Sequence, residues 1–128
     1  MATIPTELDL LAPFEIWEVL LDNATIKFHT PLVLQPEWLP DDPDEPSEQK
    51  YLCVERSDLN ISVFADNRDD LYEFVHSEIR FIWKHFVQAD DSQLNRDTKA
   101  IKQTYLKLAE AVDGYPKFRN PVYFVPYF

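Results

Sequence analysis

The chain has 128 residues, of which 45% are hydrophobic and 14% aromatic, and its formal net charge at pH 7 is −11. This composition predicts one packed domain over residues 1–128, and without an apolar run of about 18 residues we expect no transmembrane helix. Residues 1–49 carry eleven acids and one base, which argues against direct nucleic acid binding, because that needs clusters of Lys and Arg. One cysteine and an N-terminus without a basic leader predict a cytoplasmic protein.

The first forty residues predict a β-hairpin. Residues 1–11 have the pattern of an irregular or short helical lead-in. Residues 14–21 and 25–29 alternate in polarity, and Asp22-Asn23 supplies turn chemistry between them. A short helix over residues 13–21 is the alternative, because Ile16, Val19 and Leu20 also fit helical spacing. We prefer the hairpin.

Prolines dominate the next segment. Five of them lie between Pro31 and Pro46, and they predict that neither a helix nor a central strand crosses this region. The apolar residues of its first part, Trp38 among them, should pack on the body of the protein. Residues 40–49 should form an acidic, proline-rich loop that is solvated or disordered.

A strand pair and a long helix follow. Residues 49–55 and 59–65 alternate as two strands joined by residues 56–58. Cys53 in the first strand is expected to be a small core residue rather than a nucleophile paired with a distant histidine. The apolar period then changes to that of a helix over about residues 68–87, capped by Asp66 or Asn67. Its predicted buried stripe comprises Leu71, Phe74, Val75, Ile79, Ile82, Trp83 and Phe86.

A second helix is predicted over residues 95–112. Asn95 should cap it, and Gly114, the one glycine of the chain, should end it in a left-handed conformation. Its apolar stripe consists of Ile101, Tyr105, Leu108 and Val112. These elements predict an α+β fold, with an antiparallel sheet of three to five strands and two amphipathic helices packed on one face. The apolar tail, residues 121–128, should dock against the body or against a second subunit.

The sequence contains no recognisable catalytic chemistry. One glycine excludes a glycine-rich phosphate loop, and the three histidines have no second ligand at metal-binding spacing. We therefore predict a non-catalytic protein without a metal or cofactor. The alternative is a divalent-metal enzyme or nuclease that uses Asp66, Asp69 or Asp70, although helix capping explains these residues more simply.

The acidic N-terminal part either keeps the protein soluble or attracts a basic protein partner. The aromatic residues likewise belong either to the core or to an interface, because large aromatic side chains dominate interface energies. A further alternative is a structural subunit that forms homodimers or larger oligomers through its tail. The candidate partner-binding residues are Trp38, Asp41, Asp42, Asp44, Glu45, Tyr123, Phe124, Tyr127 and Phe128.

Residues 51–86 resemble the core of the HicB-like antitoxin family. In that family a strand that ends in a short polar turn precedes an acidic and then amphipathic helix. The segment from Asp66 to Leu71 stands at the position of this turn, and Trp83 lies near the helix end. The resemblance implies a partial ribonuclease-H-like β-β-β-α arrangement without nuclease activity. It also implies that the protein binds and neutralises a small toxin.

Overall fold

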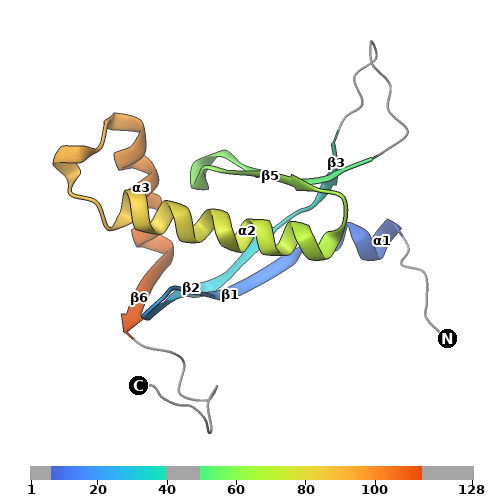
Figure 1. Ribbon diagram of the computed structural model, residues 1–128, viewed down its shortest axis with the longest axis horizontal. Helices are drawn as coiled ribbons and strands as arrows, with labels where there is room; N and C mark the ends of the chain where they lie inside the picture. The colour runs from blue at the N-terminus through green and yellow to red at the C-terminus, as the bar shows by residue number, and fades with distance from the viewer. Residues whose placement is uncertain (1–6, 40–49, 114–128) are drawn as a thin grey trace, which may run out of the picture.

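The computed structural model describes residues 7–39 and 50–113, which form two three-stranded antiparallel sheets and two main helices (Figure 1). Sheet A has the order β1 (Phe14–Leu20), β2 (Ala24–Leu34) and β6 (Ala109–Asp113). Sheet B has the order β3 (Glu37–Trp38), β4 (Leu52–Arg56) and β5 (Ile61–Ala65). A four-residue helix, α1 (Glu7–Leu10), precedes β1. The predicted α+β class with antiparallel pairing is confirmed, with the strands divided between two sheets.

The long helix α2 (Arg68–Ile82) runs between the two sheets and contacts β5 and β4 on one side and β1 on the other (Figure 1). Its buried residues join those of both sheets in one hydrophobic core. The π-helical turn η2 (Trp83–Val87) continues it, so the predicted extent of residues 68–87 is confirmed. Asn67 caps the helix, because its Oδ1 accepts a hydrogen bond from the Asp70 amide at 2.8 Å. Trp83 is buried, with 3% of its surface exposed.

The hairpin of β1 and β2 is also confirmed, but β2 extends further than the prolines predicted. It continues through Pro31 to Leu34. The pairing register shifts opposite Trp17, so that β2 residues 28–31 have no partner in the ladder with β1. In addition, β6 pairs with β2 only as far as Phe28. A proline is tolerated there because the ladder needs no amide donor at its position.

The connection between β4 and β5 is a 3-10 turn, η1 (Ser57–Leu59), which Asn60 closes with a φ of 55°. Asparagine is among the few residues other than glycine that adopt this left-handed conformation readily. The turn buries Leu59 completely. The alternation that predicted β5 therefore begins with a core residue in a turn, and the strand itself starts two residues later.

The second helix is shorter than predicted. A 3-10 turn, η3 (Asp91–Gln93), leads to α3 (Arg96–Leu108), where Asn95 acts as the predicted cap by accepting from the Thr98 amide at 2.9 Å. The chain then becomes extended at Ala109 and forms β6, so the prediction of a helix to residue 112 is wrong. Pairing of five residues with β2 replaces the last helical turn. Gly114 lies outside the described residues, and its predicted role as helix terminator fails because the helix ends six residues earlier.

The interior contact between α3 and the rest of the fold is polar as well as apolar. The hydroxyl of Tyr105 donates to the Leu59 carbonyl at 2.8 Å, and its ring lies edge-on to Trp83.

Within the described ranges, none of the helices combines the length and the apolarity needed to cross a lipid bilayer.

Candidate protein-binding surface

Sheet B ends in an open edge. β5 is the last strand of the sheet, and among the described residues it pairs with β4 alone. The amides and carbonyls on its other side are therefore available to an additional strand. Such an edge is a common site for β-strand addition by a peptide or a protein segment, in which backbone hydrogen bonds supply affinity.

An apolar groove lies along this open edge. It has a volume of about 490 Å³ and is formed between three consecutive residues of β5 and one side of α2. Because consecutive strand residues point to alternate faces, a groove that touches three in a row follows the edge of the strand. Its principal lining residues are Ser62, Val63, Phe64, Phe74, Ser77 and Phe81. We call it the α2–β5 groove.

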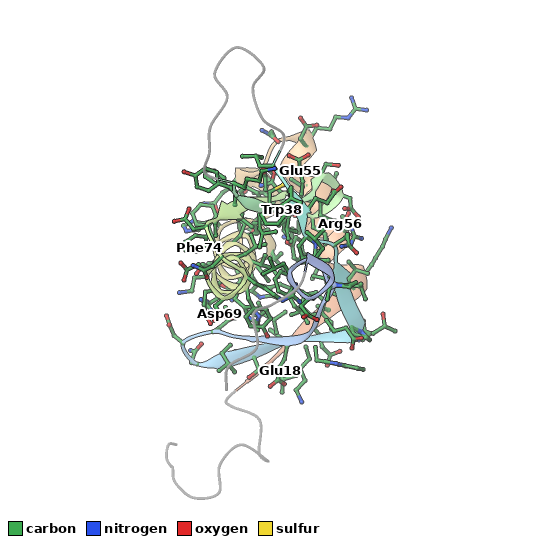
Figure 2. All side chains as sticks on the ribbon, turned by 90° about the vertical axis from the view of Figure 1, so that its right-hand side faces the viewer. Glu18, Trp38, Glu55, Arg56, Asp69 and Phe74 are labelled. Atoms are coloured by element: carbon green, nitrogen blue, oxygen red, sulfur yellow. The ribbon has the colours of Figure 1, made fainter. Side chains whose placement is uncertain are left out.

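Three phenylalanines give the groove its apolar character. Phe64, Phe74 and Phe81 are 58%, 45% and 52% exposed. Seven residues make nearly two helical turns, so Phe74 and Phe81 lie one above the other on α2. Figure 2 shows Phe74 on the outer side of the helix. Its predicted place in the buried stripe is wrong, because the stripe narrows to residues that contact the sheets, namely Leu71, Val75, Ile79 and Ile82.

The outer face of sheet B adds negative charge beside the groove. Glu37 pairs with Cys53, and Cys53 pairs with Phe64, so these three side chains share one face. Partial burial, together with Glu37 and Glu55, raises the pKa of the Cys53 thiol. Cys53 is partly exposed, and its predicted place in the core is wrong because its neighbours Leu52 and Val54 occupy the inward positions. The raised pKa makes the thiol a poor nucleophile at neutral pH.

The predicted partner-binding residues are only partly within the described chain. Trp38 lies in β3, where it is half-buried and packs against the core (Figure 2). The acids and tail aromatics of the prediction lie outside the described residues, namely Asp41, Asp42, Asp44, Glu45, Tyr123, Phe124, Tyr127 and Phe128. Sequence reasoning missed the α2–β5 groove. The sequence contained one indication of it, because Phe64 is an aromatic residue at a position of the strand where the alternating pattern places polar side chains.

The acids at the start of α2 have a structural role. Asn67 and Asp70 exchange hydrogen bonds, with the Asn67 side-chain amide donating to the Asp70 carboxylate at 3.0 Å. Among the described residues, no three His, Cys, Asp or Glu side chains come together in a group that could hold a metal ion. The alternative of a metal site at Asp66, Asp69 and Asp70 therefore has no cluster of ligands to support it in this part of the chain.

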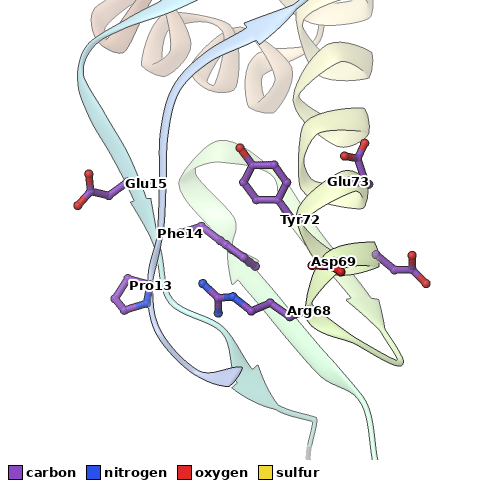
Figure 3. A pocket seen from close by; sticks show the side chains of 8 residues that line it. Pro13, Phe14, Glu15, Arg68, Asp69, Tyr72 and Glu73 are labelled. Carbon is purple, nitrogen blue, oxygen red and sulfur yellow. The ribbon is translucent and has the colours of Figure 1, made fainter. Parts of the chain in front are cut away.

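A polar pocket near this helix end is organised by Arg68 (Figure 3). The guanidinium donates to the carbonyls of Leu10 and Ala12 at 2.9 and 2.7 Å, and it lies 4.2 Å from the centre of the Phe14 ring. Arg68 therefore fastens the chain before β1 to the start of α2. Because both hydrogen bonds of its Nη1 atom serve this purpose, we assign the pocket a role in the fold.

Comparison of the chain with protein-family models, with curated proteins and with solved structures gave no match in any of the three cases. The surface of the described chain offers three features for a function: the open edge of β5, the α2–β5 groove and the acidic outer face of sheet B.

Proposed function

We propose that this protein is a non-catalytic protein-binding domain that neutralises a basic protein partner in the manner of an antitoxin. The observation that carries the proposal is the α2–β5 groove beside the open edge of β5. Exposed apolar patches bounded by polar residues are typical of protein-interaction sites. A partner segment that adds to β5 would cover the backbone edge and place apolar side chains against Phe74 and Phe81.

Charge supports a basic partner. The chain carries 23 acids and 12 bases, and Glu37, Glu55 and Glu78 lie on or next to the binding surface. Opposite fields accelerate association and disfavour acidic competitors. The antitoxin-like part of the proposal rests on the resemblance of residues 51–86 to the core of the HicB-like family.

The test is purification of the tagged full-length protein from its native host, with variants matched for exposure. Phe64→Ser combined with Phe81→Ser removes two aromatic residues from the groove. Trp17→Ser combined with Leu106→Ser is the control, because these residues are 58% and 45% exposed at other places on the surface. We expect a basic protein to co-purify with the wild type and the control, and at least tenfold less of it with the groove variant.

A second step tests neutralisation. The captured protein is expressed alone and together with this chain, and we expect it to arrest growth only when expressed alone. A wild-type protein that purifies as a monomer without a partner would contradict the proposal. If the groove variant and the control captured equal amounts of the partner, the α2–β5 groove would not be the binding site.

A further inference from the structure

We propose that residues 121–128 of the chain dock in its own α2–β5 groove, where they act as a built-in competitor for a partner. The docking follows from geometry and composition alone. The competition rests on the function proposed above.

The described chain ends near the C-terminal end of α2, on the side of that helix where sheet A lies (Figure 1). Asp113, the last residue of β6, pairs with Ala24 at the start of β2. Asp22, two residues before Ala24, accepts an ion-paired hydrogen bond from Lys84 Nζ at 3.0 Å. Lys84 lies one helical turn beyond Phe81, which lines the groove. The chain therefore leaves β6 near the C-terminal end of α2, the helix that carries Phe74 and Phe81.

The remaining chain is long enough. Fifteen residues follow Asp113, and seven of them, residues 114–120, can span up to about 23 Å at about 3.3 Å per residue. Phe74 and Phe81 are about 10 Å apart along the helix axis, at a rise of about 1.5 Å per residue. Residues 114–120 therefore give the aromatic segment that begins at residue 121 a reach about twice the length of the groove along α2.

The chemistry of the segment matches the groove. Residues 121–128 contain four aromatic and no charged side chains, so leaving them in water exposes a large apolar surface. The rings of Phe64, Phe74 and Phe81 offer edges and faces against which such residues pack favourably. The charged side chains after Asp113 are Lys117 and Arg119, whose sign is opposite to that of the acidic body.

Electrostatics and connectivity favour this occupant over a second copy of the chain. A second copy would bring a further net charge of −11 to the interface. The tethered segment brings positive charge and is present at an effective concentration on the order of millimolar, because the linker is short. Docking within one chain therefore requires only weak intrinsic affinity.

Disulfide trapping in the full-length protein tests the proposal. In a Cys53→Ser background, Tyr127→Cys in the tail is combined with Ser77→Cys in the groove. The control combines Tyr127→Cys with Gln103→Cys on α3, because both Ser77 and Gln103 are exposed. Gln103 lies in the helix that leads directly into β6, so an undocked tail reaches it easily. A third protein adds Phe81→Ser to the groove pair.

We expect the groove pair to form an intramolecular disulfide under mild oxidation at least tenfold faster than the control pair. The rate should not change on tenfold dilution, and Phe81→Ser should lower it to that of the control. Equal rates in the groove and control pairs would overturn the proposal, since they would indicate an undocked tail. Disulfides formed mainly between molecules would also overturn it and would assign the groove to a second copy. Neither result depends on whether a toxin-like partner exists.

Discussion

Removal of a single buried hydroxyl group, by Tyr105→Phe, tests how α3 is joined to the rest of the fold. The Tyr105 hydroxyl donates to the Leu59 carbonyl at 2.8 Å across 46 residues of sequence. Tyr105 has no exposed surface. The substitution retains the ring, including its edge-on contact with Trp83 at 6.4 Å between centroids. Any loss of stability therefore reports the hydrogen bond rather than packing.

The expected loss is about 2 kcal/mol in the free energy of unfolding. A typical hydrogen bond contributes about 1 kcal/mol net, and a buried acceptor left without its partner costs roughly 1–3 kcal/mol. For a domain of this size, 2 kcal/mol corresponds to a decrease in Tm of roughly 8 °C. Urea denaturation at pH 7 measures the free energy. Tyr72→Phe is the matched control, because Tyr72 is 37% exposed, and it should change stability by less than about 0.5 kcal/mol.

Alkaline pH gives an independent readout of the same group. Burial, with Glu78 and Asp58 nearby, raises the pKa of Tyr105 above its usual value of 10. Above pH 10 the unfolded chain therefore releases a proton that the folded protein retains, so this group makes stability fall as the pH rises. Tyr105→Phe should weaken that dependence, and Tyr72→Phe should not. A Tyr105→Phe protein as stable as the wild type, with the same alkaline profile, would refute the buried hydrogen bond.

Three further predictions concern the core, the helix start and acidic pH. Trp83→Ala should cost roughly 3–5 kcal/mol in urea denaturation, because the indole is buried, and a loss below about 1 kcal/mol would place it at the surface. Arg68→Ala should lower the free energy of unfolding by about 2 kcal/mol, because it removes two hydrogen bonds to carbonyls and the contact with Phe14. Arg96→Ala, at an exposed position, is the control and should change the free energy of unfolding little. Equal effects of the two substitutions would show that Arg68 does not fasten the chain before β1 to α2. Burial and the nearby Arg80 lower the pKa of His76 despite the opposing effect of Glu73. As the pH drops below about 6.5, His76 therefore becomes protonated in the unfolded chain before it does so in the folded protein, and the free energy of unfolding should fall. His76→Gln should reduce this loss of stability at acidic pH, measured by urea denaturation at several pH values. An unchanged loss would show that other groups produce it.

The local signals near the helix starts were reliable because they act over a few residues. Asn67 and Asn95 each cap a helix through a side-chain bond to an amide three residues ahead, and such a bond requires no distant partner. The change of apolar period at residue 68 likewise placed α2 correctly, because its buried face is set by the helical repeat.

The predictions of secondary structure were wrong where pairing with a distant segment overrides the local pattern. Residues 109–113 have helical spacing, yet they form β6 because β2 offers them an open strand edge. Pro31 is accommodated within β2 because the ladder lacks partners at that point. In both cases the structure depends on an interaction between residues far apart in sequence, and a local pattern cannot predict such an interaction.

The candidate site shows the same division. The sequence by itself determined that Phe64, Phe74 and Phe81 lie on one strand and one helix, because those elements follow from local periodicity. Only the tertiary structure decided that these side chains meet along an open strand edge, because the position of β5 at the end of sheet B depends on pairing with β4. The physical reason is that a periodic pattern fixes which side chains share a face, whereas exposure of that face depends on which other segments cover it.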